Sequence, residues 1–194
     1  MKTIWKIAKS ELQYLFYSPV AWLIFIIFAI QSGIIFTGLW DGFVGNKLLG
    51  YRLYSLTFNN FANQWGGLFI GVQNYLYLYI PLLTMGVMSR ELNSGSINLL
   101  YSSPVSNTQI ILGKYAALVV YCFSLICILG IYAIFSIAVI VNADIPLILT
   151  GLLGIFLLIC TYAAIGLFMS SMTSYQIVAA VGTIAVLAVM NYIK

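Results

Sequence analysis

Residues 89–115, SRELNSGSINLLYSSPVSNTQIILGKY, form a polar stretch between two strongly apolar parts of the chain. They hold Arg90, Glu91 and Lys114, which are three of the twelve Asp, Glu, Lys and Arg residues in the whole sequence. A stretch of this kind can be interpreted only together with the segments that flank it. The fold class therefore follows from the composition of the rest of the chain.

That composition is typical of an integral membrane protein. Of the 194 residues, 63% are hydrophobic and only 6% are charged, and the mean hydropathy is +1.07. A soluble domain carries about 25% charged residues, because its surface must be hydrated. Most of this surface is therefore expected to contact lipid. The eight basic residues are spread along the sequence instead of clustering, so nucleic acid is not expected as a partner.

Five apolar segments reach the length of a membrane span, at about 20–40, 69–88, 115–141, 147–169 and 177–193. A backbone that crosses lipid must satisfy its own N–H and C=O groups, so each segment is expected to be a helix. The sequence predicts an all-α fold, a polytopic membrane helix bundle in which residues 1–194 form a single transmembrane domain. The odd number of spans and the short last run suggest a chain that is incomplete at its C-terminus.

The segment before the first span, residues 1–17, has the pattern of an amphipathic helix. One arc of its helical wheel is apolar, with Ile4, Trp5, Ala8, Leu12, Leu15 and Phe16. The opposite arc is basic and polar, with Lys2, Lys6, Lys9, Ser10 and Gln13. Such a helix lies in the membrane plane with its lysines toward anionic head groups, and Glu11 belongs to the same segment. Pro19 requires a break before the first span, although the alternative is that the segment simply extends that span.

The basic residues that flank the spans predict the orientation of the chain. With the N-terminus inside, the cytoplasmic basic residues are Lys2, Lys6, Lys9, Arg90 and Lys114. The basic residues outside are then Lys47, Arg52 and Lys194. We therefore expect residues 89–115 to lie in the cytoplasm.

The sequence offers no constellation for catalysis or metal binding. It contains no histidine, and its three cysteines lack metal-ligand spacing. The acidic residues lie at or beyond the ends of the spans, at Glu11, Asp41, Glu91 and Asp144. The nucleotide-binding pattern G-x-x-x-x-G-K-[ST] does not occur. We expect no catalytic residue, metal or cofactor in this chain, so any energy must come from a partner.

The polar stretch is predicted to have a structure of its own. A short helix is expected between Ser94 and Pro104, with apolar contacts from Ile97, Leu99 and Leu100. A connection between two helices needs only about 2–8 residues. A structured element with exposed apolar side chains is what a docking site for a cytoplasmic partner requires.

The start of the third span is also specified. Ser106 and Gln109 have the spacing of a capping box, and Val105 and Ile110 occupy the positions of a hydrophobic staple. The pattern predicts a helix that begins at Ser106, well before the apolar run.

The motifs of this chain resemble those of type-2 ABC transporter permeases, and most closely those of the gliding-motility-type permeases of bacteria. Four segments carry the resemblance: RELNSGSINLLYSSPVSNTQIILGKY at 90–115, KSELQYLFYSPVAWLIFIIFAI at 9–30, YIPLLTMGVMSRE at 79–91 and FMSSMTSYQIVAAVGT at 168–183. The resemblance covers nearly the whole chain. It implies a six-helix permease half that dimerises with a second permease half and binds a separate ABC ATPase subunit, which holds the ATP.

The resemblance also assigns roles to residues by their position. Those expected to couple the chain to the ATPase are Glu91, Gly95, Ile97, Leu99, Leu100, Pro104, Ser106 and Gln109. The interfacial helix would carry Lys2, Lys6, Lys9 and Glu11. The chain departs from the pattern by showing five spans, and by having Leu92, Asn93 and Ser94 where further charged residues are usual.

These features predict the permease subunit of an ATP-driven transporter or membrane machine, in the bacterial cytoplasmic membrane with its N-terminus inside. The alternative is a non-transporting membrane scaffold that recruits a cytoplasmic protein through residues 89–115.

Overall fold

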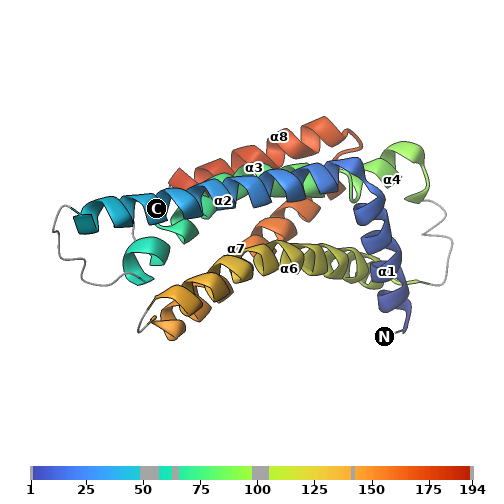
Figure 1. Cartoon of the computed structure of the whole chain (residues 1–194). Coiled ribbons are helices and arrows are strands. Elements are labelled where there is room, and N and C mark those ends of the chain that lie inside the picture. The colour runs from blue at the N-terminus through green and yellow to red at the C-terminus, as the bar shows by residue number, and fades with distance from the viewer. Residues whose placement is uncertain (1, 49–56, 63–65, 98–104, 141–142, 193–194) are drawn as a thin grey trace. The chain divides into compact units, whose positions relative to one another are not determined.

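The computed structural model describes residues 2–48, 57–62, 66–97, 105–140 and 143–192, and every regular element in these ranges is a helix (Figure 1). The elements are α1 (Lys2–Tyr17), α2 (Pro19–Leu48), the π-helix η1 (Phe58–Ala62), α3 (Leu68–Thr84), α4 (Ser89–Ser94), α6 (Asn107–Val139), α7 (Ile145–Met172) and α8 (Gln176–Tyr192). The predicted all-α polytopic helix bundle is confirmed. Leu99, Leu100 and Pro104 lie outside the described residues, as does most of the predicted 94–104 helix.

Four helical segments among the described residues are long and apolar enough to cross a membrane: Pro19–Gly42, Leu68–Ser94, Asn107–Val139 and Ile145–Met172. The fifth predicted span corresponds to α8, which is apolar but shorter, with 17 residues. Within the described residues, each of the five apolar segments is helical over most of its length, as a lipid environment requires.

The second predicted span is not one continuous helix. α3 ends at Thr84, a turn follows in which Val87 N donates to Thr84 O at 3.1 Å, and α4 begins at Ser89. Pro81 lies in the last turn of α3, where it removes one backbone donor. The apolar sequence continues past Thr84, so hydropathy predicts an unbroken span, and Pro81 is the local sign of an irregularity in this segment.

The chain divides into two compact units. The first comprises residues 1–24, 76–123 and 158–194, and the second comprises residues 25–75 and 124–157. In the second unit, Tyr132 Oη donates to Ala29 O at 3.2 Å, and Asp144 N donates to Thr57 Oγ1 at 3.2 Å. These contacts join segments about a hundred residues apart within that unit.

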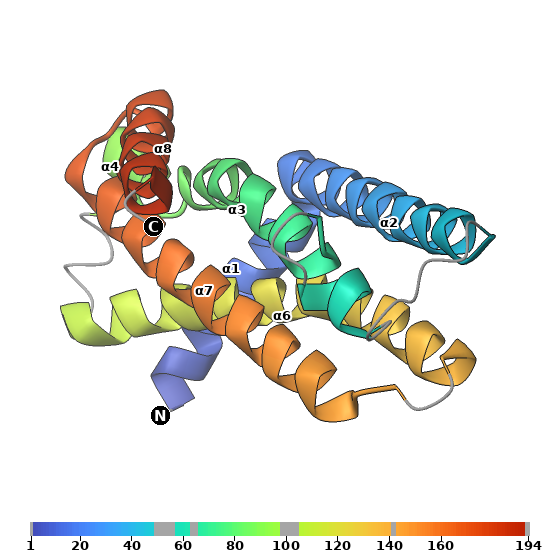
Figure 2. The same ribbon diagram turned by 90° about the vertical axis from the view of Figure 1, so that its left-hand side faces the viewer.

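In the first unit, α1 leaves the start of α2 at a sharp corner (Figure 1). Ser18 lies between the two helices, and the corner is closed by Trp22 Nε1, which donates to Phe16 O at 2.7 Å. Tyr121 on α6 packs beneath it and donates its hydroxyl to Ala21 O at 2.6 Å. The start of α8 lies beside α4, as Figure 2 shows. The predicted break before Pro19 is confirmed.

Helix α1 has the predicted basic face, because Lys6, Lys9, Ser10 and Gln13 are exposed. The apolar face differs from the prediction. Ala8 and Leu15 are buried, whereas Trp5 is 70% exposed. The stripe that packs on the protein is rotated on the wheel and includes Glu11, so Trp5 lies on its flank. Trp5 is therefore left on the surface of the protein.

Candidate functional site

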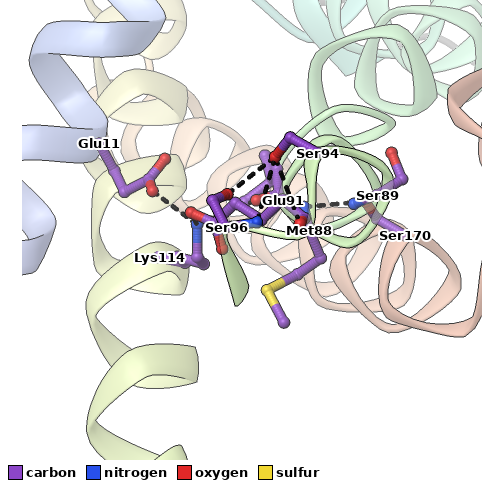
Figure 3. A network of polar contacts seen from close by, with 9 residues as sticks. Glu11, Met88, Ser89, Glu91, Ser94, Ser96, Lys114 and Ser170 are labelled. Atoms are coloured by element: carbon purple, nitrogen blue, oxygen red, sulfur yellow. Dashed lines mark hydrogen bonds and ion pairs between the residues drawn. The ribbon is translucent and has the colours of Figure 1, made fainter. Parts of the chain in front are cut away.

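The ammonium group of Lys114 lies at the centre of a buried polar cluster in the first unit. Lys114 belongs to α6, and its side chain is only 1% exposed. Its Nζ donates to Glu11 Oε1 on α1 at 2.5 Å, to Glu91 Oε1 on α4 at 2.7 Å and to the Val87 carbonyl at 3.0 Å. Figure 3 shows Glu11 and Lys114 facing each other across α1 and α6. All three donors of the ammonium are therefore used.

This cluster binds together three segments that are remote in sequence. A buried cation is stable only when partners replace its hydration, and removing one partner from a buried ion pair typically costs about 3–5 kcal/mol. The carboxylates of Glu11 and Glu91 keep 15% and 16% of their side-chain surface exposed, so they lie at the edge of the buried region. The cluster fixes α1 and α4 against α6.

Gly113 allows α1 to approach α6 closely enough for the ion pair to form. A Cβ atom built on Gly113 would lie 2.8 Å from Ile7 Cβ, which is too close for any real side chain. Ala117, one turn further along α6, is also small and buried. The small residue at position 113 therefore lets the two helices lie close together, as small residues do where helices pack tightly.

Glu91 is positioned through the backbone at the start of α4. The hydroxyl of Ser170 on α7 accepts hydrogen bonds from Met88 N and Ser89 N, both at 3.1 Å, and donates to Met85 O at 2.9 Å (Figure 3). Ser89 is fully buried. A single side chain thus satisfies two of the backbone donors at the interruption between α3 and α4, those of Met88 and Ser89. The direction of α4, and with it the Glu91 side chain, follows from this contact.

Gly166 lies one turn before Ser170 on α7 and makes room for the end of α3. A Cβ atom built on Gly166 would lie 2.8 Å from Thr84 Cβ. The two small residues together therefore let α7 cross the α3–α4 turn at close range.

After Glu91, α4 ends at Gly95, whose φ of +70° places it in the left-handed region that glycine favours. Its N–H donates to Leu92 O at 3.4 Å. Ser94 and Ser96 share a hydrogen bond between their hydroxyls at 2.8 Å, and Ile97 is buried. Gly95 therefore ends the helix that carries Glu91, and the chain is helical again at Ile97, the last described residue before 98–104. The short helix predicted after Gly95 lies mostly outside the described residues and stays a prediction.

The predicted beginning of the third span is confirmed. α6 begins at Asn107, and Gln109 N donates to Ser106 Oγ at 3.4 Å and to Ser106 O at 2.9 Å. Ile110 is buried and Val105 is half-buried. The Ser106 side chain thus caps the start of the helix by accepting from the backbone N–H of Gln109.

The remaining predicted site residues lie on α1. Lys2 opens this helix, and Lys6 and Lys9 are exposed on it, away from the cluster. The sequence did not reveal that Glu11 and Lys114 pair with each other. The available signal was a lone lysine at the edge of a long apolar segment, which needs an anionic partner when it is buried.

Arg90 is the second cation at this end of the first unit. Its guanidinium lies 3.5 Å from the centroid of the Tyr14 ring on α1, a cation–π contact. Two neighbouring residues of α4 are thus linked to α1. Glu91 is linked indirectly, because Lys114 also binds Glu11, and Arg90 contacts Tyr14 directly.

These observations define a class: a multi-pass helical membrane protein in which the N-terminal helix α1 and the short helix α4 are held against the long helix α6 by two ion pairs to one buried lysine. A family model described as "ABC-2 family transporter protein" matches residues 5–193, and the chain belongs to that family. It is accordingly a membrane permease domain of an ABC transporter, a subunit that is not itself an ATPase and that belongs to a complex with one. No curated protein and no solved structure gives a significant match to the chain.

Proposed function

We propose that this chain couples ATP hydrolysis by a separate nucleotide-binding subunit to export or to the work of a membrane machine, and that it is of the gliding-motility type. The observation that carries the proposal is the bonding of Lys114 to both Glu11 and Glu91. A displacement of the polar loop would reach α4 first. Because Glu91 is tied to Lys114, the displacement would then pass to α6 and, through Glu11, to α1.

The ATPase would contact the loop that follows α4. Asn93, Ser94 and Gly95 are exposed at the end of α4, next to the 94–104 segment that we propose as the coupling helix. Ser170 and Lys114 anchor the other end of α4 inside the protein. A short helix anchored at one end and exposed at the other can act as a lever between a partner and the spans.

In this proposal the N-terminus and the loop lie in the cytoplasm and the chain resides in the bacterial inner membrane. A second permease half completes the transport unit, and ATP binds only to the partner subunit. The basic residues of α1 support this orientation, because Lys6 and Lys9 are exposed where anionic head groups of the inner leaflet would lie.

The test is to purify the tagged chain from its native membrane and to ask whether an ABC ATPase co-purifies. ATPase stimulation is then compared for the parent, for Glu91→Ala with Leu100→Ala, and for the control Lys6→Ala on the exposed face of α1. We expect the double variant to insert into the membrane but to lose stimulation, while the control behaves as the parent does.

The outcomes separate the two candidate functions. Recovery of a different cytoplasmic protein without any ATPase would favour the scaffold. Full stimulation by the double variant would show that the coupling residues are wrongly assigned.

A further inference from the structure

A crevice of about 90 Å³ lies beside the Lys114 cluster, within the first unit. Its walls come from α1, the α1–α2 corner, the end of α3, α4 and the first residue of α8. The polar side chains at the crevice are those of Glu11, Tyr14, Ser18, Arg90 and Gln176, and the apolar side chains include Val20 and Leu82. The crevice therefore combines charged groups with an apolar wall.

Arg90 offers a cation to this crevice. Its guanidinium is half-buried and stacks on Tyr14, and within the described ranges no carboxylate forms an ion pair with it. Stacking uses the face of the guanidinium, whereas its five N–H donors lie in the plane and form a fork that matches phosphate. An oxyanion at the crevice would therefore meet prepared donors.

The crevice also contains a negative charge, the carboxylate of Glu11. Glu11 lines the same crevice, while its Oε1 accepts from Lys114. Glu11 and Glu91 are balanced in number by Lys114 and Arg90, so the four groups are neutral together. A ligand with a net negative charge would disturb this balance. A zwitterion with a phosphate and a primary ammonium would preserve it, with the phosphate on Arg90 and the ammonium on Glu11.

The position of the crevice in the fold identifies the source of such a group. It lies where the candidate spans Pro19–Gly42 and Leu68–Ser94 have their polar ends. Val20 and Leu82 line it and are each 40% exposed, which leaves apolar surface running from the crevice along the spans. This is the depth of lipid head groups, with acyl chains on the apolar side.

We propose that this crevice binds one phospholipid with a phosphoethanolamine head group. Arg90 holds the phosphate, Glu11 accepts from the ammonium, and the acyl chains follow Val20 and Leu82. The proposal rests on the membrane location of the chain and is independent of the coupling role proposed above. In this proposal the lipid head group lies between α1 and the start of α2 and contacts both helices.

The experiment is native mass spectrometry of the purified full chain after equilibration with phosphatidylethanolamine, phosphatidylcholine or phosphatidylglycerol of the same acyl composition. The quaternary ammonium of phosphatidylcholine cannot donate to Glu11, and phosphatidylglycerol has no cation. We expect phosphatidylethanolamine to be retained about tenfold more than either, the effect of losing one charge-assisted hydrogen bond.

Variants locate the site. Arg90→Gln should reduce retention of phosphatidylethanolamine about tenfold, and Arg90→Lys should give an intermediate value because charge remains without the fork. Lys9→Gln removes an exposed cation from the outer face of α1 and should change nothing. If Arg90→Gln does not fold, Arg90→Lys alone tests whether the guanidinium group of Arg90 binds the lipid.

Three results would each overturn the proposal. They are equal retention of the three lipids, preference for phosphatidylglycerol, and an Arg90→Lys variant that retains lipid as the parent does. A fourth result, binding of inorganic phosphate without retention of any of the three lipids, would identify a free anion as the occupant and would also overturn the proposal.

Discussion

Lys114 Nζ lies 2.5 Å from Glu11 Oε1, although the two residues are 103 positions apart in the sequence. The pair joins the N-terminal helix α1 directly to the long helix α6. Since Glu91 accepts from the same nitrogen, α1 and α4 can move relative to α6 only if this cluster opens.

Replacing Lys114 by Met should destabilise the protein strongly, because two carboxylates would remain close together without a cation. We expect a loss of about 3 kcal/mol in the free energy of unfolding. Thermal or denaturant unfolding in detergent measures it. The matched control is Lys9→Met, since Lys9 is an exposed lysine on α1 and should cost almost nothing.

Glu11 and Glu91 should show coupled effects, because both bind one ammonium. In a double-mutant cycle with Glu11→Gln and Glu91→Gln, we expect an interaction energy of about 0.5–3 kcal/mol. The free energies of unfolding of the four proteins give this value. Strict additivity would mean that the two carboxylates do not share Lys114.

Ser170→Ala should loosen the turn between α3 and α4. Two buried backbone donors, Met88 N and Ser89 N, would lose their acceptor, at a cost of about 1–3 kcal/mol. Hydrogen exchange should accelerate at these two amides. Ser171→Ala is the adjacent control, because Ser171 is exposed and bonds only within its own helix. Unchanged exchange at both amides would show that Ser170 does not hold the turn.

Gly166→Ala should destabilise by about 1–3 kcal/mol, because the new methyl group meets Thr84. Gly154→Ala on the same helix is the control. Nothing lies within 4 Å of its Cβ position, so the better helix propensity of alanine should leave stability unchanged or slightly higher. Comparing the melting temperatures of the two variants tests the close approach of α7 to α3.

Much of the fold could be predicted from local pattern. The lengths of the apolar segments predicted the spans. The spacing of Ser106 and Gln109 predicted the start of α6, and Pro19 predicted the break between α1 and α2. Each of these signals acts over a few residues. The coupling residues between 98 and 104 remain a prediction.

The tertiary parts of the site could not be derived in this way. Lys114 looked like an ordinary residue flanking a span, because its partners lie 23 and 103 positions away. The end of α3 depends on Ser170 from another helix, and the exposure of Trp5 depends on which stripe of α1 packs on the protein. These features are set by contacts between segments, which the pattern of one segment does not contain.

The chain order of the cluster has a consequence for biogenesis. Glu11 and Glu91 both precede Lys114, so a ribosome delivers the two anions to the bilayer before it delivers the cation. Both anionic partners of Lys114 are therefore already synthesised when this lysine leaves the ribosome, and no later segment is needed to neutralise its charge.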